Sequence, residues 1–197
     1  MILKNCSSIK KLIFSFLLIF SCFFVNASAE ELFWENPVSF STADSRFPSV
    51  VKSKKDAYIF WQEIDASSNT IYLSCRHYFS KDVYADNKRF CGPVKYSNEV
   101  PEIYSAAISE SGVVVVATVS ADNELTIYSS NDKCQSFTSK TVSHESNLIA
   151  PRVYFTSGGK FKVYVSTVDE GVFALYSLDS KDGKNWTSLK KFSPAEK

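Results

Sequence analysis

PRVYFTSGGKFKVYVSTVDEGVFALYSLDSKDGKNW, residues 151–186, contains three short segments rich in β-branched and aromatic residues, separated by turn-forming residues. Segments of this composition predict β-strands, and the serine–glycine cluster at 157–159 predicts a turn between the first two. The stretch has no apolar spacing typical of a helix. It therefore predicts a unit of three strands that is followed by a polar turn and an aromatic residue.

The same pattern occurs twice more toward the N-terminus. Each copy has an X-Pro step before its first strand, at Pro48, Pro101 and Pro151. Ser-x-Asp triplets begin at Ser80, Ser130 and Ser180, which sets a period of 50 residues. A fourth strand follows each triplet, and we expect these strands at 90–97, 137–143 and 186–193. Four-stranded units at this period are typical of the blades of a β-propeller.

We therefore predict an all-β fold, an incomplete β-propeller of three four-stranded blades plus an orphan N-terminal strand, in one domain at 30–197. The expected blades span approximately 47–97, 98–143 and 149–193. Residues 33–41 have the aromatic start and the serine end of a fourth strand, but no inner strands of their own. Since rings have about four to eight blades, three cannot close. The chain is then the N-terminal part of a longer protein, which we favour, or it associates with a second copy, or it forms an open arc.

The Ser-x-Asp triplets open segments that resemble the Asp-box, S-x-D-x-G-x-x-W, of sialidase-type BNR propellers. Residues 130–137 match with Cys134 in place of glycine, residues 180–186 match with one residue deleted, and a longer copy runs from Ser80 to Phe90. The residues that carry the resemblance are Ser80, Asp82, Ser130, Asp132, Phe137, Ser180, Asp182, Gly183 and Trp186. Because serine and aspartate side chains accept hydrogen bonds from nearby backbone N–H groups, we expect these residues to be structural.

Arg46-Phe47-Pro48 resembles the R-I-P element of sialidases, in which the arginine binds the substrate carboxylate, although Ser45 and Phe47 depart from that pattern. The resemblance makes Arg46 a candidate substrate-binding residue, and a guanidinium suits bidentate binding of a carboxylate. The alternative is that the element simply marks the start of an inner strand. No recognisable pattern supplies the acid/base residue and nucleophile pair of a retaining glycosidase, so we predict no catalytic residue.

A further candidate for a binding site is Trp61-Gln62-Glu63, which lies at the end of the predicted second strand of the first repeat. Its composition is compatible with an exposed platform for a sugar, built from an aromatic ring and a carboxylate. We favour a tryptophan in a blade interface followed by solvated loop residues.

The N-terminus predicts export. An apolar run from Leu12 to Val25 follows three lysines, and the small residues 26–29 come next. This pattern is typical of a cleavable secretory signal, so we assign residues 1–29 to a signal peptide and expect a periplasmic, cell-surface or extracellular protein. The apolar run is short for a membrane span, so we predict no transmembrane segment after cleavage. A lipid anchor at Cys22 is the open alternative.

The composition limits the classes of ligand and partner that we expect the protein to bind. Three of the 22 basic residues and none of the 21 acidic residues lie in the signal, so the remainder carries a net charge of about −2, which gives no field to attract nucleic acid. His77 and His144 have no zinc-ligand spacing, and phosphate-binding glycine loops are lacking, so we predict no metal and no cofactor. Cys75 either pairs with Cys91, or both are small buried apolar residues like Cys134.

Two functional classes follow. The first is an exported, non-catalytic propeller segment whose loops bind a protein or a glycan, and it requires no residue that the sequence lacks. The second is a fragment of a sialidase-like glycoside hydrolase. A truncated product of a longer propeller protein is a further alternative, since a fold alone does not define a function.

Overall fold

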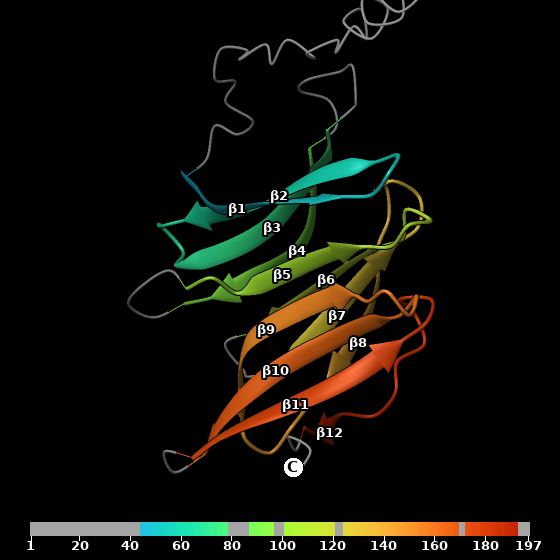
Figure 1. The fold of residues 1–197 in the computed structure, drawn as a ribbon. Coiled ribbons are helices and arrows are strands. Elements are labelled where there is room, and N and C mark those ends of the chain that lie inside the picture. The colour runs from blue at the N-terminus through green and yellow to red at the C-terminus, as the bar shows by residue number, and fades with distance from the viewer. Residues whose placement is uncertain (1–43, 79–86, 97–100, 121–123, 170–171, 193–197) are drawn as a thin grey trace, which may run out of the picture. The chain divides into compact units, whose positions relative to one another are not determined.

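The computed structural model describes residues 44–78, 87–96, 101–120, 124–169 and 172–192. Within these ranges the regular structure is twelve β-strands, arranged as three four-stranded antiparallel sheets (Figure 1). The predicted all-β fold with three four-stranded units is therefore confirmed. The signal at 1–29 and the orphan strand at 33–41 lie outside the described residues. No helix in these ranges has the length and apolar character needed to cross a membrane.

Each sheet is a meander of strands that are consecutive in the chain. Sheet A contains β1 (Asp44–Lys52), β2 (Ala57–Asp65), β3 (Thr70–His77) and β4 (Lys88–Lys95). Sheet B contains β5 (Tyr104–Ile108), β6 (Val114–Val119), β7 (Leu125–Ser130) and β8 (Thr138–Val142). Sheet C contains β9 (Asn147–Phe155), β10 (Phe161–Asp169), β11 (Val172–Ser180) and β12 (Lys190–Lys191).

The first hairpin of every sheet begins at a hydroxyl residue that fixes the turn. The Ser53 hydroxyl oxygen accepts the N–H of Asp56 at 3.1 Å. At the equivalent place in sheet B, the Ser109 hydroxyl oxygen accepts the N–H of Val113 at 2.9 Å. In sheet C, Thr156 donates its hydroxyl to a backbone carbonyl four residues later. Such side-chain bonds to nearby backbone favour turns, which explains why the polar clusters between the predicted strands form them.

The last fourth strand is shorter than predicted. We expected a strand over 186–193, but β12 is only Lys190–Lys191, and Trp186 forms an isolated bridge with Ser180. The Trp186 indole N–H turns back to donate to the Gly183 carbonyl at 2.9 Å. Thr187 then bonds to the Asp179 backbone twice: its hydroxyl oxygen accepts the Asp179 N–H, and its own N–H donates to the Asp179 carbonyl. These two bonds take the place of a regular strand ladder.

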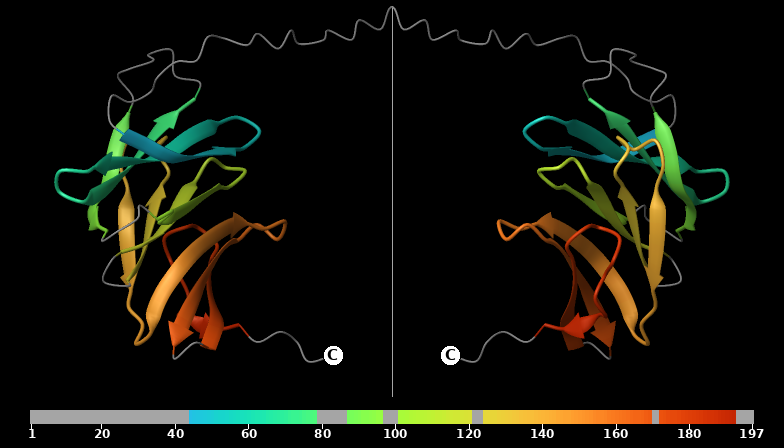
Figure 2. Two further views of the ribbon diagram at one scale, coloured as in Figure 1. Left: turned by 90° about the vertical axis from the view of Figure 1, so that its left-hand side faces the viewer. Right: turned by 90° about the vertical axis from the view of Figure 1, so that its right-hand side faces the viewer.

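Sheet B lies between sheets A and C, and the central strand β6 is buried along its whole length (Figures 1 and 2). Side chains of a strand alternate between its two faces. Val114 and Val116 accordingly belong to the core shared with sheet A, whereas Val115, Ala117 and Val119 belong to the core shared with sheet C. The innermost strands β1, β5 and β9 are also neighbours across the two interfaces.

Candidate functional site

Two of the three inner strands contain the same irregular step. Phe47 and Ala150 each precede a proline and have positive φ values of 53° and 50°. The pairing register of β1 with β2 and of β9 with β10 shifts at these places. A non-glycine residue in this region costs roughly 1–2 kcal/mol, and a bulge redirects the neighbouring side chains. The inner edges of sheets A and C are therefore candidate functional surfaces.

Arg46 lies at this edge and is bound by its own chain. Its guanidinium forms two hydrogen bonds with the Asp44 carboxylate, at 2.9 and 3.3 Å, and both side chains are half exposed. The bond to Asp44 raises the pKa of Arg46. The Nε and Nη2 groups of Arg46 are thus directed at Asp44, so the charge that would attract a substrate carboxylate is partly neutralised within the strand.

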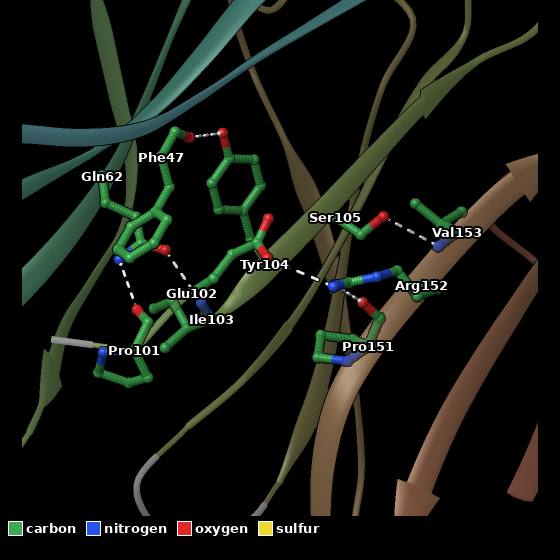
Figure 3. Close-up of polar contacts among 10 residues, drawn as sticks. All are labelled: Phe47, Gln62, Pro101, Glu102, Ile103, Tyr104, Ser105, Pro151, Arg152 and Val153. Atoms are coloured by element: carbon green, nitrogen blue, oxygen red, sulfur yellow. Dashed lines mark hydrogen bonds and ion pairs between the residues drawn. The ribbon is translucent and has the colours of Figure 1, made fainter. Parts of the chain in front are cut away.

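A second arginine occupies the inner edge of sheet C. Arg152 forms an ion pair with Glu102 of the segment before β5, with 3.3 Å between Nη2 and Oε2 (Figure 3). Arg152 also donates to the Pro151 carbonyl at 2.9 Å. No local pattern predicts this pair, because the two residues are fifty positions apart in different repeats. Like Arg46, Arg152 is neutralised within the chain.

Gln62 connects sheets A and B. It is fully buried on β2, its amide nitrogen donates to the Pro101 carbonyl at 2.9 Å, and its amide oxygen accepts the N–H of Ile103 at 2.9 Å (Figure 3). Gln62 therefore satisfies two backbone groups of the segment before β5, whose bond to sheet B is the one from the Val119 N–H to the Ile103 carbonyl. Burial of such groups without partners is costly, so Gln62 fixes how sheet B meets sheet A.

Tyr104 binds the backbone of β1 at the residue where its pairing with β2 shifts. Its hydroxyl donates to the Phe47 carbonyl at 2.6 Å and also lies 3.0 Å from the Phe60 carbonyl. Burial raises the pKa of Tyr104, so the phenol keeps its proton and remains a donor. In sheet C the corresponding link is the Ser105 hydroxyl oxygen, which accepts the N–H of Val153 at 3.1 Å. These contacts give the inner-edge residues a structural function.

Trp61-Gln62-Glu63 fits neither sequence-based interpretation, because β2 continues to Asp65 and all three side chains are buried. The Trp61 indole N–H donates to a Glu63 carboxylate oxygen at 3.1 Å. Glu63 also forms an ion pair with Arg89 of β4. The stretch is part of a strand, so the alternative of an exposed sugar platform and our expectation of solvated loop residues after Trp61 were both wrong.

The two Ser-x-Asp turns that the structure describes use the same kind of bond, at a spacing that differs by one residue. The Ser130 and Ser180 hydroxyl oxygens accept the N–H groups of Cys134 and Gly183 at 3.0 and 2.9 Å. Asp132 accepts the hydroxyl and N–H of Ser136, which lowers the pKa of Asp132 to about 2. The saturated carboxylate is a poor candidate for acid/base chemistry.

In the third repeat, the N–H groups of Asn185 and Lys184 bind the Asp182 carboxylate and lower its pKa. Trp186 is buried in the core shared by sheets B and C. Phe137 is partly buried, with its ring stacked on that of Phe90 at a centroid distance of 4.2 Å. Ser80 and Asp82 of the first repeat lie outside the described residues.

A groove lies between sheets B and C, on the side of the hairpins and Ser-x-Asp turns. Its volume is about 460 Å³, and its walls include the rings of Phe155 and Phe161, whose centroids are 5.0 Å apart. Ser109, Ser111 and Asn131 contribute polar groups. A neighbouring depression of about 390 Å³ shares Ser111 and Phe155, and so extends the groove along the first hairpins. Sequence reasoning missed this groove, because its walls come from separate repeats.

The cysteines are reduced and buried. Cys75, Cys91 and Cys134 are all free thiols, and Cys75 is not joined to Cys91. Among the residues that the structure describes, no group of three or more His, Cys, Asp and Glu side chains is arranged to hold a metal ion.

No protein-family model matches the chain, and the search of curated protein sequences found no match. Among solved structures, the fold is similar to a subtype N11 neuraminidase-like protein of A/flat-faced bat/Peru/033/2010 (H18N11), at 12% identity and a TM-score of 0.54 over 80% of this chain. A subtype N10 neuraminidase-like protein of A/little yellow-shouldered bat/Guatemala/060/2010 matches over 75% of this chain, at 14% identity and a TM-score of 0.49. A fucose lectin from Kordia zhangzhouensis matches over 75%, at 10% identity and a TM-score of 0.47, and is covered completely.

The chain spans 41% and 43% of the two neuraminidase-like proteins. At this level of identity the likeness concerns the fold alone. Together with the three four-stranded sheets, the N11 comparison shows that this chain has a β-propeller-type fold similar to part of that protein.

Proposed function

We propose that the chain is an exported, non-catalytic segment of a β-propeller of the Asp-box type, and that the groove between sheets B and C binds a glycan. The groove supports this proposal. It combines the partly exposed ring of Phe155 with polar groups from Ser111 and Asn131, and the charged side chains of Lys181, Asp182 and Lys184 also line it. Apolar surfaces with a few directed polar groups are typical of small-molecule sites, and a sugar offers both C–H faces and hydroxyl groups.

The inner edge supports a role in binding over a role in catalysis. Both arginines there are held by carboxylates of the chain, Arg46 by Asp44 and Arg152 by Glu102. Tyr104 is engaged with backbone carbonyls and keeps its proton. A glycosidase of the retaining class needs two carboxyl groups about 5–5.5 Å apart on either side of the scissile bond. The contacts of Arg152 and Tyr104 instead link neighbouring sheets, whereas the pair of Arg46 and Asp44 lies within β1.

Glycan binding is tested with the purified chain on a glycan array, followed by calorimetric titration of the best ligand. Ser111→Trp places a large ring in the groove and should weaken that binding by at least roughly tenfold, about 1.4 kcal/mol. Ser188→Trp is the matched control, since Ser188 is exposed and does not line the groove. Equal loss in both variants, or binding of proteins but not of glycans, contradicts the proposed ligand class.

A hydrolysis assay tests the alternative of a sialidase-like enzyme. We expect no turnover of a fluorogenic sialoside by the purified chain, with a known sialidase as the positive control. Turnover that disappears in Arg46→Ala would overturn the non-catalytic assignment and give Arg46 the substrate-binding role that its sequence context suggests.

Export is tested by expressing the full chain in a secreting host and sequencing the N-terminus of the exported product. We expect cleavage after Ala29, so that the product begins at Glu30. The double variant Leu17→Lys with Leu18→Lys interrupts the apolar run and should keep the chain inside the cell. A product that begins at an acylated Cys22 would contradict cleavage after Ala29 and would support the lipid anchor.

A further inference from the structure

The groove between sheets B and C has a basic end. Lys181 and Lys184 of the third Ser-x-Asp turn line it, and both side chains are exposed. Among the residues that the structure describes, neither ammonium group forms an ion pair. Two cationic groups without a counter-charge of their own thus lie in the same groove as the partly exposed ring of Phe155.

Asp182 also lines the groove, but its carboxylate is engaged by the turn. Oδ1 accepts the N–H groups of Lys184 and Asn185 at 2.9 and 2.8 Å and the Ser180 hydroxyl at 3.0 Å. Oδ2 accepts the side-chain amide of Asn185 at 2.7 Å. One carboxylate against two ammonium groups leaves this end of the groove with a net positive charge.

The groove continues into a depression of the opposite charge. This depression shares Ser111, Phe155 and Gly159 with the groove, and Glu110 lines it whereas neither lysine does. The Glu110 side chain is exposed and forms no ion pair within the part of the chain that the structure describes. A ligand with one anionic group is therefore attracted at the lysines and repelled at Glu110, which gives the bound ligand a direction.

The lysine pair distinguishes the third Ser-x-Asp turn from the second. When the serine, aspartate and aromatic residues of the two turns are aligned, Asn131 corresponds to Lys181 and Gln135 to Lys184. The additional residue of the second turn, Lys133, does not line the groove. Because both turns are held by serine and aspartate side chains and by backbone N–H groups, the turn itself does not require the two ammonium groups.

Two ammonium groups suit a tetrahedral oxyanion. An arginine fork matches the planar carboxylate, and no arginine is among the described residues that line the groove. An ammonium group is a compact point charge with three donors. The terminal oxygens of a sulfate or phosphate ester point in different directions, so one ester can accept hydrogen bonds from two ammonium groups at once.

We propose that the glycan bound in this groove carries a sulfate or phosphate ester, and that Lys181 and Lys184 bind this ester. The inference rests on the proposed function, because it names the class of glycan that the same groove takes. The sugar next to the ester packs against Phe155, and the part of the glycan that reaches toward Glu110 is uncharged.

The experiment is an array of matched glycan pairs, including chondroitin oligosaccharides with and without sulfate and mannose oligosaccharides with and without phosphate, probed with the purified chain. We expect the ester to tighten binding by roughly fivefold to tenfold. The sulfate and phosphate arms show which oxyanion is preferred. The gain should shrink between about 0.1 M and 1 M salt, because the screening length falls from about 10 Å to about 3 Å.

The outcomes separate this inference from the proposed function. Glycan binding without any gain from the ester overturns the inference and leaves the proposed function intact, whereas the absence of all glycan binding contradicts both. Desulfated chondroitin retains its carboxylates, so binding equal to that of the sulfated form would overturn the choice of a tetrahedral oxyanion.

The double variant Lys181→Gln with Lys184→Gln tests the two assigned residues by calorimetric titration. It should weaken binding of the tightest esterified glycan by roughly tenfold and leave binding of its unesterified partner unchanged. Lys54→Gln with Lys55→Gln is the matched control, since it removes the same charge at exposed positions outside the groove. Equal losses in the two double variants, or equal losses for both members of the glycan pair, would overturn the assignment.

Discussion

Sheet B contacts its two neighbours through opposite faces of one strand, but the two interfaces are built from different residues. The interface with sheet A adds an aromatic cluster and a buried polar bridge to an aliphatic core. The ring of Phe90 stacks on Phe137 and meets Phe60 and Tyr128 edge-on, while Gln62 bonds to two backbone groups across the interface. The interface with sheet C is mainly aliphatic and includes Val115, Ala117, Leu125, Ile127, Val163, Val165 and Leu178.

Comparing the two interfaces separates the contribution of apolar burial from that of directed hydrogen bonds. Counted from the first hairpin, Gln62 of β2 and Val119 of β6 hold equivalent positions, because Ala57 and Val114 both begin the ladder with the inner strand. A valine at this position stabilises by burial alone, which is non-directional. A glutamine with two bonds fixes one arrangement, and it costs more when it is removed. The A–B interface should therefore depend on single residues more strongly than the B–C interface does.

The largest expected effect is from Gln62→Leu, which preserves much of the volume but leaves the Pro101 carbonyl and the Ile103 N–H without their partner. The free energy of unfolding should fall by about 3–4 kcal/mol, since each buried group that loses its bond costs roughly 1–3 kcal/mol. Urea denaturation measures this change. Gln135→Leu, at an exposed turn position, is the control and should change little. A small loss for Gln62→Leu would show that the polar bridge does not specify the A–B interface.

The next effect concerns the B–C interface. A Cβ at Gly183 would lie 2.9 Å from a methyl of Val115 and 3.2 Å from one of Val113, and the φ of Gly183 is 76°. Gly183→Ala should therefore destabilise by about 2–3 kcal/mol through strain and overpacking. Gly159→Ala is a matched control, because its φ is 71° but its Cβ would have no neighbour within 4 Å. The control should lose only about 1 kcal/mol. Equal losses would mean that backbone strain alone makes the third turn require glycine.

A smaller effect is expected at the equivalent position of the second turn. Under reducing conditions Cys134→Gly relieves the left-handed strain but removes a buried side chain from the A–B core. These changes oppose each other, so the free energy of unfolding should change by about 1 kcal/mol or less. The measurement is again urea denaturation, with excess reductant. A loss above that of Gly183→Ala would show that packing of the Cys134 side chain in the A–B core outweighs the backbone strain.

The local part of the fold was predictable from the sequence, whereas its inter-sheet contacts were not. Strands such as Phe161–Asp169 follow from short-range composition, and hydroxyl residues such as Ser109 fix their own turns. The burial of Gln62 depends on a proline carbonyl 39 residues away, which no local pattern encodes. Arg46 was recognised by its neighbours, but its pairing with Asp44 becomes clear only from the geometry of β1.

The smallest expected effect is electrostatic and is common to both interfaces. Hydrogen bonds from Ser136 lower the pKa of Asp132 to about 2 in the folded chain, against an unfolded value of about 3.9. The stability that this carboxylate contributes is fully present above about pH 4 and is lost as the pH falls through about 2. Asp132→Asn should therefore be less stable than wild type at neutral pH, with a difference that shrinks over this window.

Asp182→Asn makes the same test in the third turn, where backbone N–H groups hold the carboxylate and also lower its pKa. Urea denaturation from pH 2 to pH 7 should show a difference from wild type that shrinks toward low pH for both variants, because each carboxylate accepts hydrogen bonds within its own turn. Both carboxylates are exposed to solvent, so screening keeps the difference modest. A pH-independent difference in one variant alone would mean that its turn is held by packing and not by its aspartate.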